Sequence, residues 1–535
     1  MPLLRRLVLL TFAALALAFP ATGARADAAE ISAIVDRFAT ASKFPQVEAV
    51  IEALGAAGDP LAVPALRALE AGELQVAPDG RVVIERGDAL LDPVTLEAAA
   101  PVEGRLKKVR TKNSIRRMIG DVISGLTLRA PDTAVRMTAA ETIFASADAG
   151  QLDALEAALA EETDAGVKSR MEEARAAILL TASDDPAVQM AAIDIIAGRG
   201  DQQALAVLAT YANQASNADV QAAAREGVAE IESTLAMWQA GQNIWYGVSL
   251  GSVLFLAAIG LAITFGVMGV INMAHGEMVM LGAYTTFVVQ ETIRNSFPGA
   301  FEFSLLIALP LAFLVSGLVG LVMERGIIRH LYGRPLETLL ATWGVSLILQ
   351  QAVRTIFGPN NREVGNPDWM SGAFMIGEMS VTWSRLWIVV FALCVFGALL
   401  FAMNRTPLGL QMRAVTQNRR MASAMGIRTP WVDALTFALG SGIAGIAGVA
   451  LSQIDNVSPN LGRTYIIDSF MVVVFGGVGN LWGTLVGGLT LGVVNKFLEP
   501  YAGAVLGKIL ILVFIILFIQ RRPRGLFALK GRAVE

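Results

Sequence analysis

The sequence predicts an all-α protein in which an exported helical repeat domain precedes an α-helical membrane bundle of about nine spans. Apolar residues make up 54% of the 535-residue chain and charged residues only 16%, a balance typical of membrane proteins. The formal net charge of -4 combines -14 over residues 27–240 with +7 over residues 241–535, the rest lying in a basic N-terminal stretch. An acidic soluble part joined to a basic membrane part argues against nucleic acid as a partner.

The chain starts with the pattern of a secretory signal peptide. Arg5 and Arg6 precede an apolar core at residues 7–19, and an A-x-A cleavage pattern ends at Ala26. This core is too short for a comfortable membrane span, so we predict cleavage after Ala26 and export of residues 27–240 to the periplasm. An uncleaved anchor is the alternative.

Alanine-rich amphipathic helices separated by Asp, Pro and Gly breaks fill most of residues 27–240. Similar units begin at Pro131, Thr163, Asp185 and Asn217. The acidic residue at the start of a unit can cap the helix N-terminus, and the alanines let neighbouring helices approach closely. The units resemble HEAT-like repeats, which stack into a solenoid and offer a surface to partners. A plain helical spacer is the alternative.

The helical pattern breaks between residues 72 and 104, where LQVAPDGRVVIERGD predicts a β-hairpin that turns at Asp79-Gly80. Residues 27–240 contain no histidine, no cysteine and no glycine-rich phosphate loop, so we predict no enzyme site there. Cys394 is the only cysteine of the chain and lies in a predicted span, which excludes an intrachain disulfide.

The remaining chain, residues 241–535, contains apolar segments that reach or approach the length needed to cross a lipid bilayer. They cover residues 245–270, 275–290, 304–323, 336–357, 386–403, 431–453, 465–478, 481–497 and 504–520. The second and seventh are short. Arginine and lysine gather after the third, fifth and ninth segments, whereas the other loops are comparatively acidic. This pattern predicts a multi-pass protein of a bacterial inner membrane with a periplasmic N-terminal domain and a cytoplasmic C-terminus.

The loop at residues 405–429 carries five arginines and no acidic residue, which places it on the cytoplasmic face. Its candidate functional residues are Gly409, Arg413, Ala414, Asn418, Ala424 and Gly426. A short helix bounded by glycines can fit a groove on a soluble partner and pass its movement to the flanking spans. An ordinary charged loop is the alternative.

Polar residues inside the predicted spans are candidates for a solute pathway. Asn272, His275 and Glu277 cluster at the start of the second span, and Thr342, Ser346 and Gln350 lie four residues apart on one face of the fourth. They could line a pathway or bond neighbouring helices to one another. Small residues at 440–448 and 476–488 predict close helix packing. We predict no catalytic residue and no metal site.

Four segments carry a family resemblance. FGVMGVINMAHGEMVMLGAY at residues 265–284 resembles a region of the permeases of branched-chain amino-acid ABC importers that carries G-x-x-N-x-x-H followed by G-A-Y. Residues 472–488 resemble their glycine-rich late segment, RRPRGLF at residues 521–527 their C-terminal signature, and residues 405–429 their coupling loop to the ATPase. An exported helical domain before the permease makes the chain similar to the urea-type permeases of that family.

The resemblance implies a transport subunit that works with a second, related permease chain, two cytoplasmic ATP-binding subunits and a periplasmic substrate-binding protein. No G-x-x-x-x-G-K-[ST] loop is present, so we expect no ATPase site and no cofactor on this chain, with ATP bound by the partner subunits. The expected solute is urea or a related short amide. A branched-chain amino-acid permease is the near alternative, and a membrane-anchored receptor or scaffold and a self-contained channel are alternatives of other classes.

Overall fold

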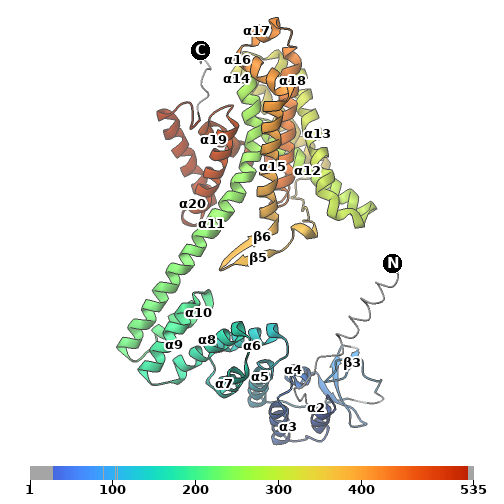
Figure 1. The fold of residues 1–535 in the computed structure, drawn as a ribbon. Coiled ribbons are helices and arrows are strands. Elements are labelled where there is room, and N and C mark those ends of the chain that lie inside the picture. Colours follow the sequence, from blue (N-terminus) through green and yellow to red (C-terminus); the bar gives the residue numbers. More distant parts are fainter. Residues whose placement is uncertain (1–27, 88, 103, 105, 528–535) are drawn as a thin grey trace, which may run out of the picture. The chain divides into compact units, whose positions relative to one another are not determined.

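The computed structural model describes residues 28–87, 89–102, 104 and 106–527 (Figure 1). The predicted signal peptide at residues 1–26 lies outside the described residues. The chain divides into two compact units, Met1–Leu235 and Ala236–Glu535. We describe each unit by itself.

The first unit combines helices with a small sheet. Its α-helices are α2 (Ala28–Val35), α3 (Phe44–Ala57), α4 (Val63–Ala71), α5 (Asn113–Thr127), α6 (Thr133–Ser146), α7 (Leu152–Glu161), α8 (Ala165–Ala182), α9 (Pro186–Arg199), α10 (Gln202–Ala212) and the start of α11 (Ala218–Met268). One apolar core packs α2 to α5 against the sheet, and a second lies between α6 and the start of α11.

Four strands interrupt the helices of the first unit. They are β1 (Leu74–Val76), β2 (Val82–Arg86), β3 (Ala89–Leu91) and β4 (Lys107–Lys108), in the antiparallel order β3-β2-β1-β4. β1 and β2 form the predicted hairpin, and Gly80 adopts the positive φ of 86° that its turn requires. The all-α prediction is therefore wrong in detail, because this sheet and a second hairpin, β5 (Ala373–Ile376) with β6 (Met379–Thr382), are present.

The predicted helix caps of the repeat units are confirmed. The carboxylates of Asp132, Asp164 and Asp185 accept hydrogen bonds from backbone N–H groups in the first turns of α6, α8 and α9, at distances of 2.9 to 3.0 Å. Asn217 does the same at the start of α11 through its side-chain oxygen. These bonds satisfy N–H groups that a helix start leaves free. Assignment of the unit to HEAT-like repeats stays a prediction.

The second unit is a helical bundle with one short hairpin. After α11 it contains α12 (His275–Ser296), α13 (Ser304–Gly326), α14 (Pro335–Phe357), α15 (Trp383–Arg405), α16 (Pro407–Gln417), α17 (Arg419–Ala424), α18 (Thr429–Leu451), α19 (Leu461–Gly476) and α20 (Leu481–Arg521). α12, α13 and α18 pack against one another, and α16 and α17 lie at one end of the bundle (Figure 1).

The count of nine spans is not confirmed. Within the described part of the chain, five helical segments are long and apolar enough to cross a membrane: Ala218–Met268, Pro298–His330, Trp383–Arg405, Thr429–Leu451 and Leu481–Arg521. α12 and α14 have sufficient length, but their polar residues lower their mean hydropathy, and α19 has only 16 residues. The last two predicted spans both fall within α20.

α20 bends sharply in its middle. Gly503 has non-helical dihedral angles, with φ 72° and ψ 166°. The arm before the bend meets α19 in antiparallel order, because Gly483 lies against Gly476 and Gly487 against the earlier Val472. After the bend, Lys508 pairs with Asp468 in the middle of α19 and Phe518 packs on Phe475 near its end, which is a parallel order. The two arms therefore run past α19 in opposite directions.

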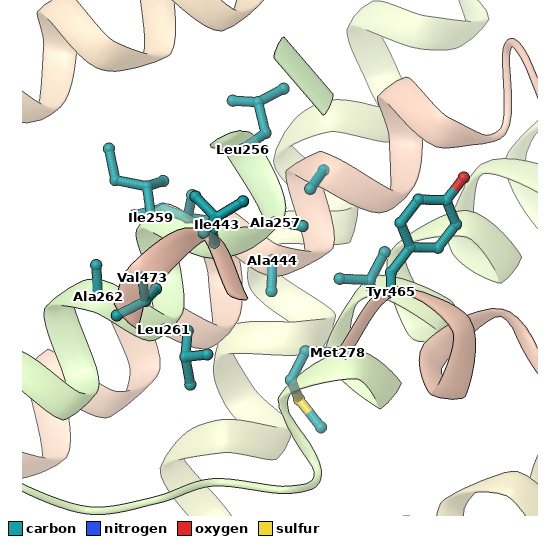
Figure 2. Close-up of a cluster of buried hydrophobic side chains, with 14 of the residues drawn as sticks. Leu256, Ala257, Ile259, Leu261, Ala262, Met278, Ile443, Ala444, Tyr465 and Val473 are labelled. Carbon is teal, nitrogen blue, oxygen red and sulfur yellow. The ribbon is translucent and has the colours of Figure 1, made fainter. Parts of the chain in front are cut away.

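Small residues let the helices of the bundle touch backbone to backbone, as predicted for residues 440–448. A Cβ atom added to Gly282 of α12 would collide with the Gly445 carbonyl of α18, and one added to Gly448 would collide with the Val279 carbonyl. Beside these contacts, apolar side chains of α11, α12, α18 and α19 form a common core (Figure 2).

We expect Gly282→Ala to destabilise the bundle by about 1–3 kcal/mol, because the added methyl group overpacks a backbone contact. The apparent melting temperature of the detergent-purified chain would fall accordingly. Gly344→Ala in α14 is the matched control, since nothing lies within 4 Å of its added Cβ, and helix propensity favours alanine. Equal melting temperatures for the Gly282 variant and the wild type would contradict this packing argument.

Candidate functional site

The predicted polar residues at the start of α12 are buried inside the bundle. Asn272 precedes the helix and its side-chain oxygen accepts a hydrogen bond from the Ala274 N–H at 3.0 Å. His275 opens the helix and its Nε2 donates to the Ala257 carbonyl of α11 at 2.8 Å. Both side chains are fully buried. They therefore hold the chain where it turns from α11 into α12.

Glu277 connects α12 to the polar face of α14. Its Oε1 accepts hydrogen bonds from Ser346 Oγ at 2.9 Å and from Gln350 Nε2 at 2.8 Å, and Gln350 also donates to Ser346 at 3.1 Å. Thr342, one turn earlier on α14, accepts a hydrogen bond from the Met273 N–H at 3.1 Å. The two predicted polar groups, which are distant in sequence, thus form one buried cluster.

Some polar atoms of this cluster are not used for packing. Within the described residues, Asn272 Nδ2, His275 Nδ1 and Glu277 Oε2 are buried and have no hydrogen-bond partner. Thr342 serves backbone packing, whereas Glu277 keeps one carboxylate oxygen available. The role in helix packing is therefore shown for part of the cluster, and the role in a solute pathway stays a prediction.

The loop at residues 405–429 folds into α16 and α17. Gly409 packs directly on the Met403 carbonyl, so it has no room for a side chain. Arg413 donates to the same carbonyl and thereby caps the end of α15. Asn418 caps α17 by accepting a hydrogen bond from the Met421 N–H at 3.0 Å. Three of these residues thus shape the loop itself.

The other predicted loop residues lie at its turns. Ala414 accepts a hydrogen bond from the Asn418 N–H at 3.1 Å at the end of α16. Ala424 is the exposed last residue of α17. Gly426 is exposed and has a φ of 88°, a conformation that strongly favours glycine. The loop is therefore an ordered elbow of two short helices.

An ion pair that the sequence analysis missed anchors this elbow to the bundle. Arg419 of α17 forms a two-pronged salt bridge with Asp433 of α18, whose side chain is fully buried. The guanidinium also lies over the Tyr332 ring, and Tyr332 donates a hydrogen bond to Glu324 of α13 at 3.2 Å. An acidic residue inside a predicted apolar span needs a partner, so Asp433 in the predicted span at residues 431–453 could have indicated this ion pair from the sequence.

The outer surface of the elbow carries exposed apolar side chains. Leu410, Met421 and Met425 have exposed fractions of 62%, 60% and 80%. Exposed apolar residues grouped among charges often mark a protein contact. These three side chains, which lie on or next to α17 and α16, are therefore candidates for contact with a partner protein.

The opposite end of α18 borders a polar hollow of about 330 Å³. Its walls come from residues 363–366, which follow α14, and residues 452–456, which follow α18. Two backbone hydrogen bonds between Arg362 and Val457, at 2.8 and 3.0 Å, hold these loops together. The described residues contain no group of three or more His, Cys, Asp or Glu side chains that could hold a metal ion.

The C-terminal signature packs against the glycine-rich late segment. The N–H groups of Leu526 and Phe527 donate to carbonyl oxygens at the end of α19, at 2.9 and 3.1 Å. Gly525 lies against Gly477 with a φ of 75°. Two motif segments that lie apart in sequence therefore form one structural element.

A family model decides the class of this chain. The model described as "Branched-chain amino acid transport system / permease component" matches residues 243–519. The chain belongs to this family. The permease is 32% identical over 293 residues to the "High-affinity branched-chain amino acid transport system permease protein BraD" of Pseudomonas aeruginosa, with 53% of this chain and 94% of the relative covered.

Other relatives agree. The "High-affinity branched-chain amino acid transport system permease protein LivH" of Escherichia coli K12 is 31% identical, with 53% of this chain and 94% of the relative covered. The "Probable branched-chain amino acid transport permease protein LivH" of Methanocaldococcus jannaschii is 24% identical, with 51% and 88% covered. No solved structure matches the chain.

The matched region is the membrane bundle. Membership makes the chain a multi-pass membrane permease of a transport system, and implies partner subunits that bind ATP and substrate. The relatives are permease subunits, which is consistent with the prediction that this chain is a transport subunit and not an enzyme. The first unit, Met1–Leu235, ends before the matched residues 243–519.

We expect Asp433→Asn to loosen α17, because the variant leaves Arg419 without its charged partner. Hydrogen exchange of the backbone amides at residues 419–428 should become about tenfold faster or more. Arg420→Ala, which changes an exposed arginine of the same helix, is the control and should leave exchange unchanged. Unchanged protection in the Asp433 variant would show that the ion pair does not hold the elbow.

Proposed function

We propose that the chain is the membrane-spanning permease subunit of an ATP-driven importer of branched-chain amino acids. The family match over residues 243–519, with relatives covered over 94% of their length, is the observation that carries this proposal. These relatives favour branched-chain amino acids over urea, which the sequence analysis had placed first. The interior polar cluster supports a transport role, because an anchor for a receptor or scaffold needs no buried carboxylate.

Urea is the second candidate solute. The observation in its favour is the first unit, which precedes the region shared with the amino-acid relatives and thus has no counterpart in that alignment. A helical domain in this position is the feature that makes the chain similar to urea-type permeases. The two solutes share N–H groups that a carboxylate can bind, so the polar cluster does not favour either of them.

The proposed mechanism is alternating access. A loaded substrate-binding protein docks on the periplasmic side. We place the first unit on that side, and also the polar hollow at the C-terminal end of α18. Two ATP-binding subunits move on the cytoplasmic side. Their motion reaches the elbow of α16 and α17, and the salt bridge between Arg419 and Asp433 passes it to α18. A second permease chain would complete the pathway, and ATP would bind only to the partner subunits.

Initial uptake of labelled leucine and labelled urea, measured side by side in nitrogen-limited cells, tests the proposal. Deleting this chain should abolish ATP-dependent uptake of leucine and leave urea uptake intact. Loss of urea uptake alone would transfer the assignment to the second candidate. Loss of neither would favour the receptor or scaffold, and flux that persists without ATP would indicate a channel.

The exposed apolar tip of the elbow provides a separate test of coupling. We expect Met425→Asp to weaken association with the ATP-binding subunits at least about tenfold, because a charge would replace an apolar contact at an interface. Co-purification of these subunits with the tagged permease measures the effect. Tyr501→Asp, at an equally exposed position in the bend of α20, is the control, and equal recovery from both variants would remove the elbow from the interface.

A further inference from the structure

Two helix N-termini meet in the interior of the bundle. α12 begins at His275 and α19 at Leu461, and their first turns touch at Gly276 and Gly462. A Cβ atom added to Gly462 would lie 2.7 Å from the Gly276 carbonyl carbon. The aligned peptide groups of a helix give each N-terminus a partial positive charge. The contact therefore places two positive helix ends at one point.

This point lies at mid-depth along α11. His275 bonds to the Ala257 carbonyl, and Ala257 lies halfway along the apolar part of α11, predicted at residues 245–270. A Cβ atom added to Gly260 of α11 would lie 3.0 Å from the His275 ring. Helices that begin inside a bundle, rather than at its surface, are a recurrent way to build solute sites in transporters.

The carboxylate of Glu277 points into this junction. Ser346 and Gln350 both donate to Oε1 and so fix its orientation. Oε2 faces α19, because a Cβ atom added to Gly462 would lie 2.7 Å from it. The side chain is 1% exposed, and none of the described residues donates a hydrogen bond to Oε2. A buried carboxylate oxygen without a hydrogen-bond donor destabilises the folded state, because it has lost its water and gained no partner.

We propose that Oε2 of Glu277, held at the junction of α12 and α19, accepts hydrogen bonds from the N–H groups of the solute during its passage. This inference rests on the proposed function and names the site within it. The chemistry is shared by the ammonium group of an amino acid and the amide groups of urea, since both present N–H donors to a carboxylate. The orphaned Asn272 Nδ2 adds a donor, and His275 Nδ1 an acceptor, on the same segment.

A purely structural role makes a different prediction. If Glu277 only bonded α12 to α14, glutamine would replace it with little loss, because the amide oxygen can still accept from Ser346 and Gln350. In the proposed role, Glu277→Gln turns the free acceptor into an N–H donor. Donor would then face donor, and the solute would lose both a hydrogen bond and a charge.

The experiment expresses Glu277→Gln in cells that retain the partner subunits and lack the wild-type chain. Initial uptake of labelled leucine and labelled urea at saturating concentration is divided by the amount of chain in the membrane. We expect at least about a tenfold fall for the solute that the wild type transports. Glu291→Gln, an exposed glutamate of the same helix, is the control and should keep wild-type uptake.

The outcomes separate the site from the function. Wild-type uptake by Glu277→Gln would overturn the site and leave the proposed function standing, whereas absence of uptake in wild-type cells would overturn the function itself. A fall confined to leucine identifies the ammonium as the donor group, and a fall confined to urea identifies the amide. If Glu277→Gln fails to insert, Glu277→Asp decides, because shortening the side chain withdraws the oxygen from Gly462, and unchanged uptake would then overturn the site.

Discussion

The second unit depends on satisfying polar groups where the chain leaves helical geometry inside an apolar bundle. Between α11 and α12 the backbone loses its helical hydrogen bonds, and hydrocarbon offers no water in exchange. Thr342 supplies an acceptor for the Met273 N–H and Asn272 one for the Ala274 N–H. This requirement accounts for Thr342 in the polar stripe of α14, whereas Ser346 and Gln350 of the same stripe bond the Glu277 carboxylate. The stripe lowers the mean hydropathy of α14 below that of a simple span.

Close backbone contact is the second requirement of this arrangement. Two helix starts can meet inside the bundle only if no side chains separate them, which Gly276 and Gly462 allow. The packing of α12 on α18 through Gly282 and Gly445 obeys the same condition. Glycine thus sets the distance between these helices, and the short distance brings Glu277 of α12 against Gly462 of α19.

Local patterns in the sequence predicted much of this structure. Asp132, Asp164 and Asp185 cap helices as expected, and the spacing of Thr342, Ser346 and Gln350 correctly placed them on one face. Contacts between residues distant in sequence could not be predicted in this way, because periodicity shows which face of a helix is polar but not which residues that face contacts. The salt bridge of Asp433 and the junction with Gly462 were missed for this reason. The nine-span count is not confirmed, because polar residues lower the mean hydropathy of α12 and α14. The short α19 and the break in α20 do match the short seventh segment and the gap between the last two predicted segments.

The salt bridge that anchors the elbow depends on the planar guanidinium group of Arg419. Arg419 must reach both oxygens of Asp433 with a planar fork while its flat face lies on the Tyr332 ring, 4.7 Å from the ring centre. Lysine has the same charge but neither the fork nor the flat face. A lysine at position 419 would therefore keep the positive charge and lose both the two-pronged contact with Asp433 and the stacking on Tyr332.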